Sequence, residues 1–186
     1  MTAPTTLAVV SCSLNPSSRS HRLALAAEES VRAQGAAGEL VDLREWELPM
    51  CDGGSSFRHQ SVDGLSDIIT RASAILVSAP VYNYDLNAAA KNLVEMTGQS
   101  WTEKPVGFLC SAGGDRSYMS PIGFANSLMF DFRCLILPRF VYCTKTDVDA
   151  DGALAPPILE RVDDLVRSAV TLARALDWAR QHDGSG

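Results

Sequence analysis

Hydroxyl-bearing side chains gather in one short stretch near the start of the chain. Ser13, Ser17, Ser18 and Ser20 fall within eight residues, and Arg19 lies among them. The stretch follows an apolar run and precedes helix-forming sequence, so it is predicted to join a buried strand to a helix N-terminus. Amides of the first helical turn lack partners within the helix, and the helix dipole is positive there. The stretch therefore predicts a phosphate site, with serines that merely cap the helix as an equal alternative.

Two phosphate-binding motifs are absent from the stretch, and their absence indicates which kind of phosphate it would bind. It contains no Gly-Lys-Ser or Gly-Lys-Thr sequence, so no lysine is aimed at a triphosphate. It also contains no glycine, which separates it from the fingerprint of dinucleotide-binding proteins. A terminal monophosphate, held by hydroxyl groups and backbone amides, fits this composition best.

Aromatic and amide side chains follow a second apolar run, in residues 79–87. Tyr82 and Tyr84 flank Asn83 there. Flat rings with a polar tip suit an aromatic ligand, and an asparagine offers both a donor and an acceptor to a heterocycle. A turn whose tyrosines pack on neighbouring helices is the alternative for this loop.

A pair of glycines, Gly113 and Gly114, follows a third apolar run. Without a Cβ atom, a glycine backbone can come very near a planar ligand and point its amides at it. An ordinary tight turn is the alternative for an isolated glycine pair.

Strand and helix patterns alternate along the chain and place these loops. Five strands are expected at residues 6–11, 39–43, 74–79, 106–110 and 135–142, the third of them ended by Pro80. Helices are expected at residues 22–34, 62–72, 86–97, 121–132 and 158–179, with a long loop over 44–60. The alternation predicts a three-layer α/β sandwich with a parallel sheet. Ligands of such sheets bind at the carboxyl ends of the strands, where the three unusual loops would meet.

Composition sets outer limits on the function. A chain of 186 residues that is 46% hydrophobic and 20% charged suits a single globular domain spanning residues 1–186. A net charge of −6 argues against a general nucleic-acid binder, and no apolar run is long enough to span a membrane. Residues 2–6 carry no basic side chain before the first apolar run. No signal peptide is therefore expected, and the cytoplasm is the expected compartment.

The cysteines and histidines do not form a reactive set in the sequence. The five cysteines include no C-x-x-C pair and mostly fall in apolar segments, so they are expected to act as small hydrophobic residues. The three histidines have no ligand spacing, and no metal site is expected. No Ser-His-Asp or Cys-His set indicates hydrolysis.

Taken in order, three segments resemble one family. Residues 11–20, residues 79–83 together with Lys91-Asn92, and residues 111–114 are similar to the NAD(P)H-dependent FMN reductases. The resemblance extends over roughly residues 6–142. It implies a flavodoxin-like fold with a five-stranded parallel sheet in the order 2-1-3-4-5.

The resemblance also implies roles for individual residues. The FMN phosphate would be bound by Ser13, Asn15, Ser18, Arg19 and Ser20, although many members have arginine in place of Asn15 and asparagine in place of Ser20. The ribityl chain and ring of FMN would lie along Pro80, Val81, Tyr82 and Asn83. The isoalloxazine would be bordered by Ser111, Ala112, Gly113 and Gly114.

The implied activity is transfer of hydride from NADPH or NADH to FMN, and then reduction of a small-molecule acceptor such as a flavin, a quinone or an azo compound. No catalytic side chain is required, because the cofactor carries the chemistry. A homodimer or homotetramer is implied as well. Two alternatives remain open: a flavodoxin-type electron carrier, which would need a separate reductase, and a flavodoxin-like binding module that has lost FMN.

Overall fold

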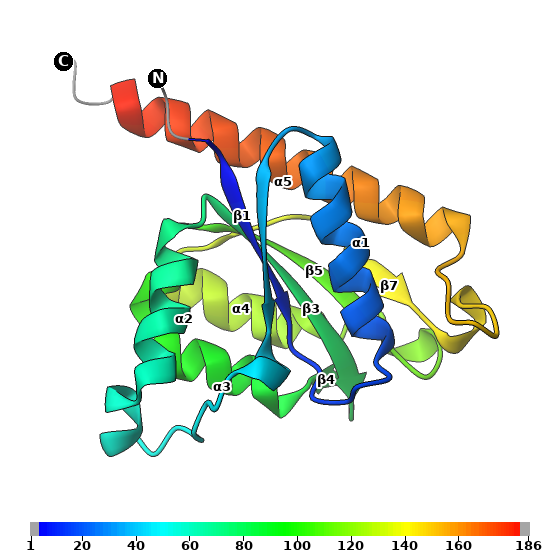
Figure 1. Ribbon diagram of the computed structural model, residues 1–186, viewed down its shortest axis with the longest axis horizontal. Coiled ribbons are helices and arrows are strands. Elements are labelled where there is room, and N and C mark those ends of the chain that lie inside the picture. The colour runs from blue at the N-terminus through cyan, green and yellow to red at the C-terminus, as the bar shows by residue number, and fades with distance from the viewer. Residues whose placement is uncertain (1–3, 183–186) are drawn as a thin grey trace.

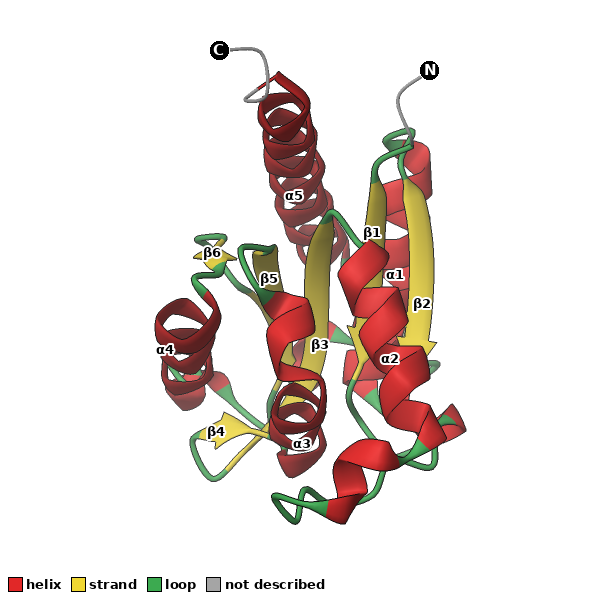
Figure 2. Ribbon diagram, turned by 90° about the vertical axis from the view of Figure 1, so that its left-hand side faces the viewer, coloured by secondary structure: helices red, strands yellow, loops and turns green. Residues whose placement is uncertain are grey.

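The computed structural model describes residues 4–182 as a central sheet between two layers of helices (Figure 1, Figure 2). Residues 1–3 and 183–186 lie outside the described residues. The expectations of a domain over 1–186 and of no signal peptide at residues 2–6 therefore fall partly outside them. None of the helices in the described part of the chain combines the length and apolar character needed to cross a membrane.

Parallel strands form the sheet, as the alternating pattern predicts. The main order is β2-β1-β3-β5-β6, which is the predicted order of the five expected strands. Their bounds are Thr6–Ser11 (β1), Ala37–Asp42 (β2), Ala74–Tyr82 (β3), Pro105–Ser111 (β5) and Leu135–Ile136 (β6). Two short strands bring the total to seven: β4 (Asp85–Leu86), antiparallel to β3, and β7 (Val141–Cys143), parallel to β5.

Helices cover both faces of the sheet (Figure 2). One face carries α1 (Arg19–Ala33) and α5 (Pro156–His182), and the other carries α2 (Gln60–Arg71), α3 (Ala88–Thr97) and α4 (Pro121–Phe132). Short 3₁₀ helices span Leu43–Glu45, Ser55–Arg58, Gly98–Trp101, Asp115–Ser117 and Lys145–Asp147. The predicted loop over 44–60 thus contains helical turns at both ends.

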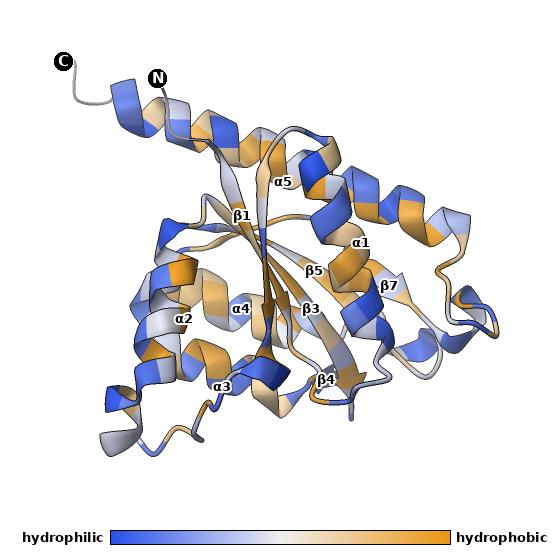
Figure 3. Ribbon diagram, viewed as in Figure 1, coloured by the Kyte–Doolittle hydropathy of each residue, from blue (hydrophilic) through white to orange (hydrophobic). Residues whose placement is uncertain are grey.

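The strands are apolar on both sides because each side has its own core. Val9 and Leu76 pack toward α1 and α5, whereas Val10 and Val77 pack toward α2, α3 and α4. Side chains alternate between the faces of a strand, so a strand buried on both faces becomes a continuous apolar run. In Figure 3 the strands are largely hydrophobic, whereas hydrophobic and hydrophilic residues alternate along the helices.

The third strand does not end at Pro80, contrary to the prediction. It continues to Tyr82, and Pro80 pairs in register with Ser111 of β5. On its other side β3 pairs with β1 only as far as Ser78. Pro80 therefore lies where the neighbouring strand has already ended, and a missing backbone donor costs little at such a position.

The helix predicted to begin at Leu86 begins at Ala88 instead, because a hairpin precedes it. Asp85 pairs with Tyr82 across a two-residue turn. Both turn residues are left-handed, with φ of 51° at Asn83 and 69° at Tyr84. This is the backbone of a type I′ hairpin, which usually carries glycine at its second position. Without that glycine, the sequence gives little sign of the hairpin.

The strand predicted over 135–142 is divided into β6 and β7. Pro138 lies in the gap and has no backbone donor, and Arg139 after it adopts a left-handed φ of 62°. The ladder to β5 is therefore interrupted at the edge of the sheet. It resumes at Val141 and Tyr142, which pair with Leu109 and Cys110.

Candidate functional site

The three unusual loops meet at the carboxyl ends of β1, β3 and β5. They enclose a hollow of about 150 Å³. Its lining consists of Ser13, Asn15, Ser17, Ser18, Arg19, Pro80, Val81, Tyr82, Ser111, Ala112 and Gly113. All of these except Ser17 belong to the predicted site set. Three predicted residues, Ser20, Asn83 and Gly114, lie next to lining residues in the chain but are not part of the lining.

The N-terminus of α1 opens into this hollow without a side-chain cap. The helix begins at Arg19, three residues earlier than predicted, which places Ser18 at the N-cap position. The Ser18 side chain makes no capping hydrogen bond, and its Oγ lies 2.7 Å from Oγ of Ser20. The capping alternative therefore does not describe Ser18. The amides of the first turn keep the arrangement that binds anions.

Asn15 shapes the loop that precedes the helix. Its side-chain oxygen accepts a hydrogen bond from the Ser17 amide at 2.9 Å, and its own amide donates to Ser13 Oγ at 3.3 Å. Its carbonyl oxygen accepts from the Ser18 amide at 3.1 Å. Asparagine favours such local turns, so Asn15 holds the serines in place around the hollow.

Arg19 joins two of the loops. Its Nη2 donates to the Ala112 carbonyl oxygen at 2.9 Å, across to the loop after β5. Its buried Nε has no hydrogen-bond partner among the described residues. Leaving a buried charged donor unpaired is costly, and a phosphate oxygen is the kind of acceptor that a guanidinium prefers.

The tyrosines of the β3–β4 hairpin lie at the surface. Tyr82 is 55% exposed and Tyr84 is 62% exposed. The Tyr84 hydroxyl donates to the Arg116 carbonyl oxygen at 2.6 Å, which ties the hairpin to the loop after β5. Both tyrosines thus lie mostly at the surface, and Tyr84 contacts the 3₁₀ turn Asp115–Ser117. Tyr82 is part of the lining of the hollow.

The glycines of the loop after β5 are not explained by the protein's own packing. A Cβ added at Gly113 or at Gly114 would meet no atom within 4 Å. Neither glycine is among those with a positive φ, so the backbone does not require them. The Gly114 carbonyl oxygen is fixed by a hydrogen bond from the Tyr142 hydroxyl at 2.9 Å. The open space above a fixed backbone fits a flat ligand.

A polar network next to the loop after β1 was not predicted from the sequence. Arg44 donates to Asp42 through its Nε at 2.9 Å, lies 3.2 Å from His21 through its Nη2 and reaches the Pro16 carbonyl at 3.4 Å. Burial by itself would raise the pKa of Asp42, but the hydrogen bonds from Arg44 lower it below its usual value. The network joins β2, α1 and the loop after β1. Since its members come from three elements, no spacing in the sequence reveals it.

The same network brings a serine, a histidine and an aspartate together, but not as a hydrolase triad. Ser11 Oγ and Asp42 Oδ2 both face Nδ1 of His21, at 3.1 and 3.5 Å. In a triad the serine faces one ring nitrogen and the aspartate the other. Here the second nitrogen faces Arg44, and Ser11 is fully buried. The cluster therefore braces the fold and is not arranged for hydrolysis.

The fold is a flavodoxin-like α/β sandwich in which three loops meet at the carboxyl ends of β1, β3 and β5. Residues 5–148 match the family of NADPH-dependent FMN reductases, and the chain belongs to that family. It is thus an NAD(P)H-dependent oxidoreductase that uses FMN and acts on small-molecule acceptors.

Solved structures share the fold. An oxidoreductase from Corynebacterium diphtheriae matches with a TM-score of 0.77 and 18% identity, over 92% of this chain and 98% of that one. The flavoenzyme NAD(P)H:(acceptor) oxidoreductase FerB from Paracoccus denitrificans matches with a TM-score of 0.75 and 21% identity, over 92% and 98% of the two chains. The apo form of an NADH:FMN oxidoreductase matches with a TM-score of 0.75 and 14% identity, over 91% and 90%.

Proposed function

We propose that the hollow at the N-terminus of α1 holds the FMN phosphate. The observation that carries this proposal is the uncapped helix end, which is surrounded by hydroxyl groups and by an arginine with an unpaired buried donor. Ser13, Ser17, Ser18 and Arg19 would contact the phosphate directly. Ser20, fully buried and 2.7 Å from Ser18, would position that hydroxyl instead.

The two other loops would hold the rest of the cofactor. The hollow suits the phosphate and the start of the ribityl chain, next to Pro80 and Val81. The ring would lie over the rim, between Tyr82 and the Gly113-Gly114 backbone. The exposed tyrosine face and the open space at the glycines support this placement. Asn83 would stand at the edge of the ring rather than beneath it.

The residues of this chain bind and orient the cofactor rather than carry out the chemistry. FMN, when bound, takes two electrons from a nicotinamide and gives them to a second acceptor. The Gly113 and Gly114 amides would favour negative charge on the reduced ring, because fixed donors need no reorganisation. The exposed rim leaves room for a planar partner, so a free flavin, a quinone or an azo compound is the proposed acceptor class.

A visible spectrum of the purified protein tests the proposal. After FMN is added and the excess is removed, the protein should stay yellow and should bleach anaerobically with NADPH or NADH. Retained colour that never bleaches would instead identify an electron carrier. No retained flavin, together with no NAD(P)H oxidation in excess FMN, would identify a module that has lost the cofactor.

A substitution tests the position of the phosphate. Ser18→Asp should abolish FMN retention, because a carboxylate at the N-cap position would repel the phosphate. Thr171→Asp on the exposed surface of α5 adds the same charge elsewhere and should retain FMN fully. A Ser18→Asp protein that purifies yellow would show that the phosphate binds at another place.

We also propose that the chain is a homodimer or homotetramer. Ile122, Met129 and Phe130 on α4 are exposed by 44%, 41% and 81%, at positions that share one face of the helix. Apolar faces of this kind mark contacts between proteins, and a two-fold dimer would cover the same face on both copies.

We propose further that residues 1–186 form one FMN-binding domain in the cytoplasm. The two hydrophobic cores of the described chain lie on opposite faces of one sheet, which supports a single domain. All five cysteines are free, which suits a reducing compartment. Cell fractionation with an antibody to the chain would test the compartment.

A further inference from the structure

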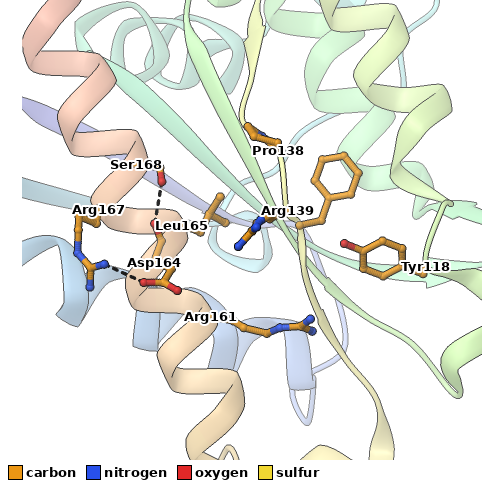
Figure 4. Close-up of a pocket in the computed structure, with 9 residues that line it drawn as sticks. Tyr118, Pro138, Arg139, Arg161, Asp164, Leu165, Arg167 and Ser168 are labelled. Carbon is orange, nitrogen blue, oxygen red and sulfur yellow. Dashed lines mark hydrogen bonds and ion pairs between the residues drawn. The ribbon is translucent and has the colours of Figure 1, made fainter.

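A second hollow, larger than the flavin site, lies at the edge of the sheet between α5 and the segment that joins β6 to β7. It has a volume of about 610 Å³. Three arginines from two elements line it: Arg139 from the joining segment, and Arg161 and Arg167 from α5. Figure 4 shows Arg139 extending from the strand edge toward α5 and Arg161 extending from α5 toward that edge. The function described above uses none of these side chains.

The charges in this hollow are only partly compensated. Arg167 pairs with Asp164 at 2.8 Å, whereas neither Arg139 nor Arg161 forms an ion pair within residues 4–182. One carboxylate among three guanidinium groups leaves two positive charges. This excess stands out on a chain whose net charge is −6. It equals in magnitude the charge of a phosphate monoester, which is about −2 at neutral pH.

The backbone at Arg139 is in an uncommon conformation. Arg139 has a left-handed φ of 62°, a conformation that a side chain with a Cβ rarely adopts. The Arg139 side chain extends toward α5 (Figure 4).

The remaining lining adds flat apolar surface and an acceptor. Tyr118 and Phe140, with ring centroids 6.5 Å apart, both line the hollow. Such rings stack on a planar base. Asp164 gives one carboxylate oxygen to Arg167, and its other oxygen can accept from a sugar hydroxyl. Groups that could contact a phosphate, a planar ring and a sugar thus all line one hollow.

We propose that this hollow binds a nucleotide through a phosphate monoester. Arg139 and Arg161 would hold the phosphate, the Tyr118–Phe140 wall would contact the base, and Asp164 would contact the ribose. The nucleotide is either free or part of NADPH, whose adenosine carries the same group. The site is separate from the flavin hollow, since no residue lines both, and the inference does not depend on FMN binding.

Calorimetric titration of the full chain, saturated with FMN, tests the proposal. The probes are 5′-AMP, 2′,5′-ADP, inorganic phosphate and adenosine. Both nucleotides should bind, phosphate more weakly, and adenosine not measurably. Arg139→Gln and Arg161→Gln should each weaken nucleotide binding about tenfold or more, because each removes a charge-assisted contact. Arg58→Gln removes an exposed arginine that does not line this hollow. This variant should bind the nucleotides as the wild type does.

Further outcomes show whether the bound nucleotide is free or part of NADPH, and some of them would overturn the proposal. If Arg139→Gln raises KM for NADPH but not for NADH, the bound group is the phosphate of the electron donor; if neither changes, it is a free nucleotide. No nucleotide binding, or binding insensitive to both arginine substitutions, would refute the site. Titration of Ser18→Asp and of Arg139→Gln, both without added FMN, supplies a second check. Binding that is lost in Ser18→Asp but survives in Arg139→Gln would belong to the flavin phosphate loop, and the proposal would be wrong.

Discussion

At the scale of single residues, substitutions at two glycines can distinguish a role in ligand binding from a role in packing. A Cβ at Gly113 meets nothing within 4 Å, whereas a Cβ at Gly107 would lie 2.9 Å from Leu76 Cδ2 and 3.1 Å from Leu165 Cδ1. Gly113→Ala should therefore change the free energy of unfolding by less than about 0.5 kcal/mol while weakening FMN binding by about tenfold or more. Gly107→Ala should cost about 1–3 kcal/mol through overpacking.

Thermal unfolding without FMN measures the first quantity, and quenching of FMN fluorescence on titration measures the second. A Gly113→Ala protein that loses stability and keeps its FMN affinity would show that the glycine serves the turn. The tight-turn alternative for this loop would then be correct.

The cysteines give a second prediction at this scale. Four of the five are buried, and desolvation raises the pKa of Cys110 to about 12 and that of Cys134 to about 11. Thiolates are the reactive form, so the buried thiols should be inert in the native protein. Only Cys51, which is partly exposed, should react quickly with a thiol reagent such as DTNB.

The measurement is the number of thiols that react before and after unfolding in guanidinium. Cys51→Ser should remove the rapid phase without changing stability. A rapid phase that persists in Cys51→Ser would mean that a strand thiol opens to solvent, and the tight packing around β1 and β5 would be in doubt.

At the scale of elements, the Asp42–Arg44–His21 network links the end of β2 to the loop after β1, where we place the FMN phosphate. Its contribution to the stability of the fold depends on pH, and the direction of this dependence follows from the pKa of Asp42. The pKa of Asp42 is lowered in the folded state, so the stabilisation is present above the ordinary aspartate pKa of about 3.9 and is lost as pH falls below it. Asp42→Asn should cost about 1.5–3 kcal/mol at pH 7, and this difference from the wild type should shrink below about pH 4.

Urea unfolding at several pH values measures the difference, and FMN titration at pH 7 should show weaker binding in Asp42→Asn because Arg44 then holds Pro16 less firmly. The matched control is Asp131→Asn, which removes an exposed carboxylate from α4. A loss in Asp42→Asn that stays constant down to pH 3 would show that the charge of Asp42 does not contribute.

Elements differ in how well the sequence predicts them, for physical reasons. Strands buried on both faces become apolar runs, so β1, β3 and β5 were predictable, and the loops at their ends followed from the rule for parallel sheets. The hairpin at Asn83 and Tyr84 was missed because its turn lacks the usual glycine. The Asp42 network was missed because contacts between three elements leave no periodic pattern in the chain.

At the scale of the whole molecule, the proposed flavin site opens at the carboxyl ends of the strands while α4 exposes an apolar face. If this face joins two copies, burial of Phe130, which is 81% exposed, contributes substantially to association. Phe130→Asp would place a charge on each side of a two-fold contact, where like charges repel. We expect the wild type to elute as an oligomer and Phe130→Asp to shift toward the monomer mass.

Size-exclusion chromatography with light scattering measures the mass, and circular dichroism checks that the variant is folded. Leu159→Asp is the matched control, since Leu159 is 41% exposed on α5 and should keep the wild-type mass. A wild-type monomer, or an oligomer that survives Phe130→Asp, would remove α4 as the contact. If the dimer separates and FMN affinity falls with it, the partner copy completes the rim of the flavin site. If the affinity is unchanged, each copy binds its cofactor alone.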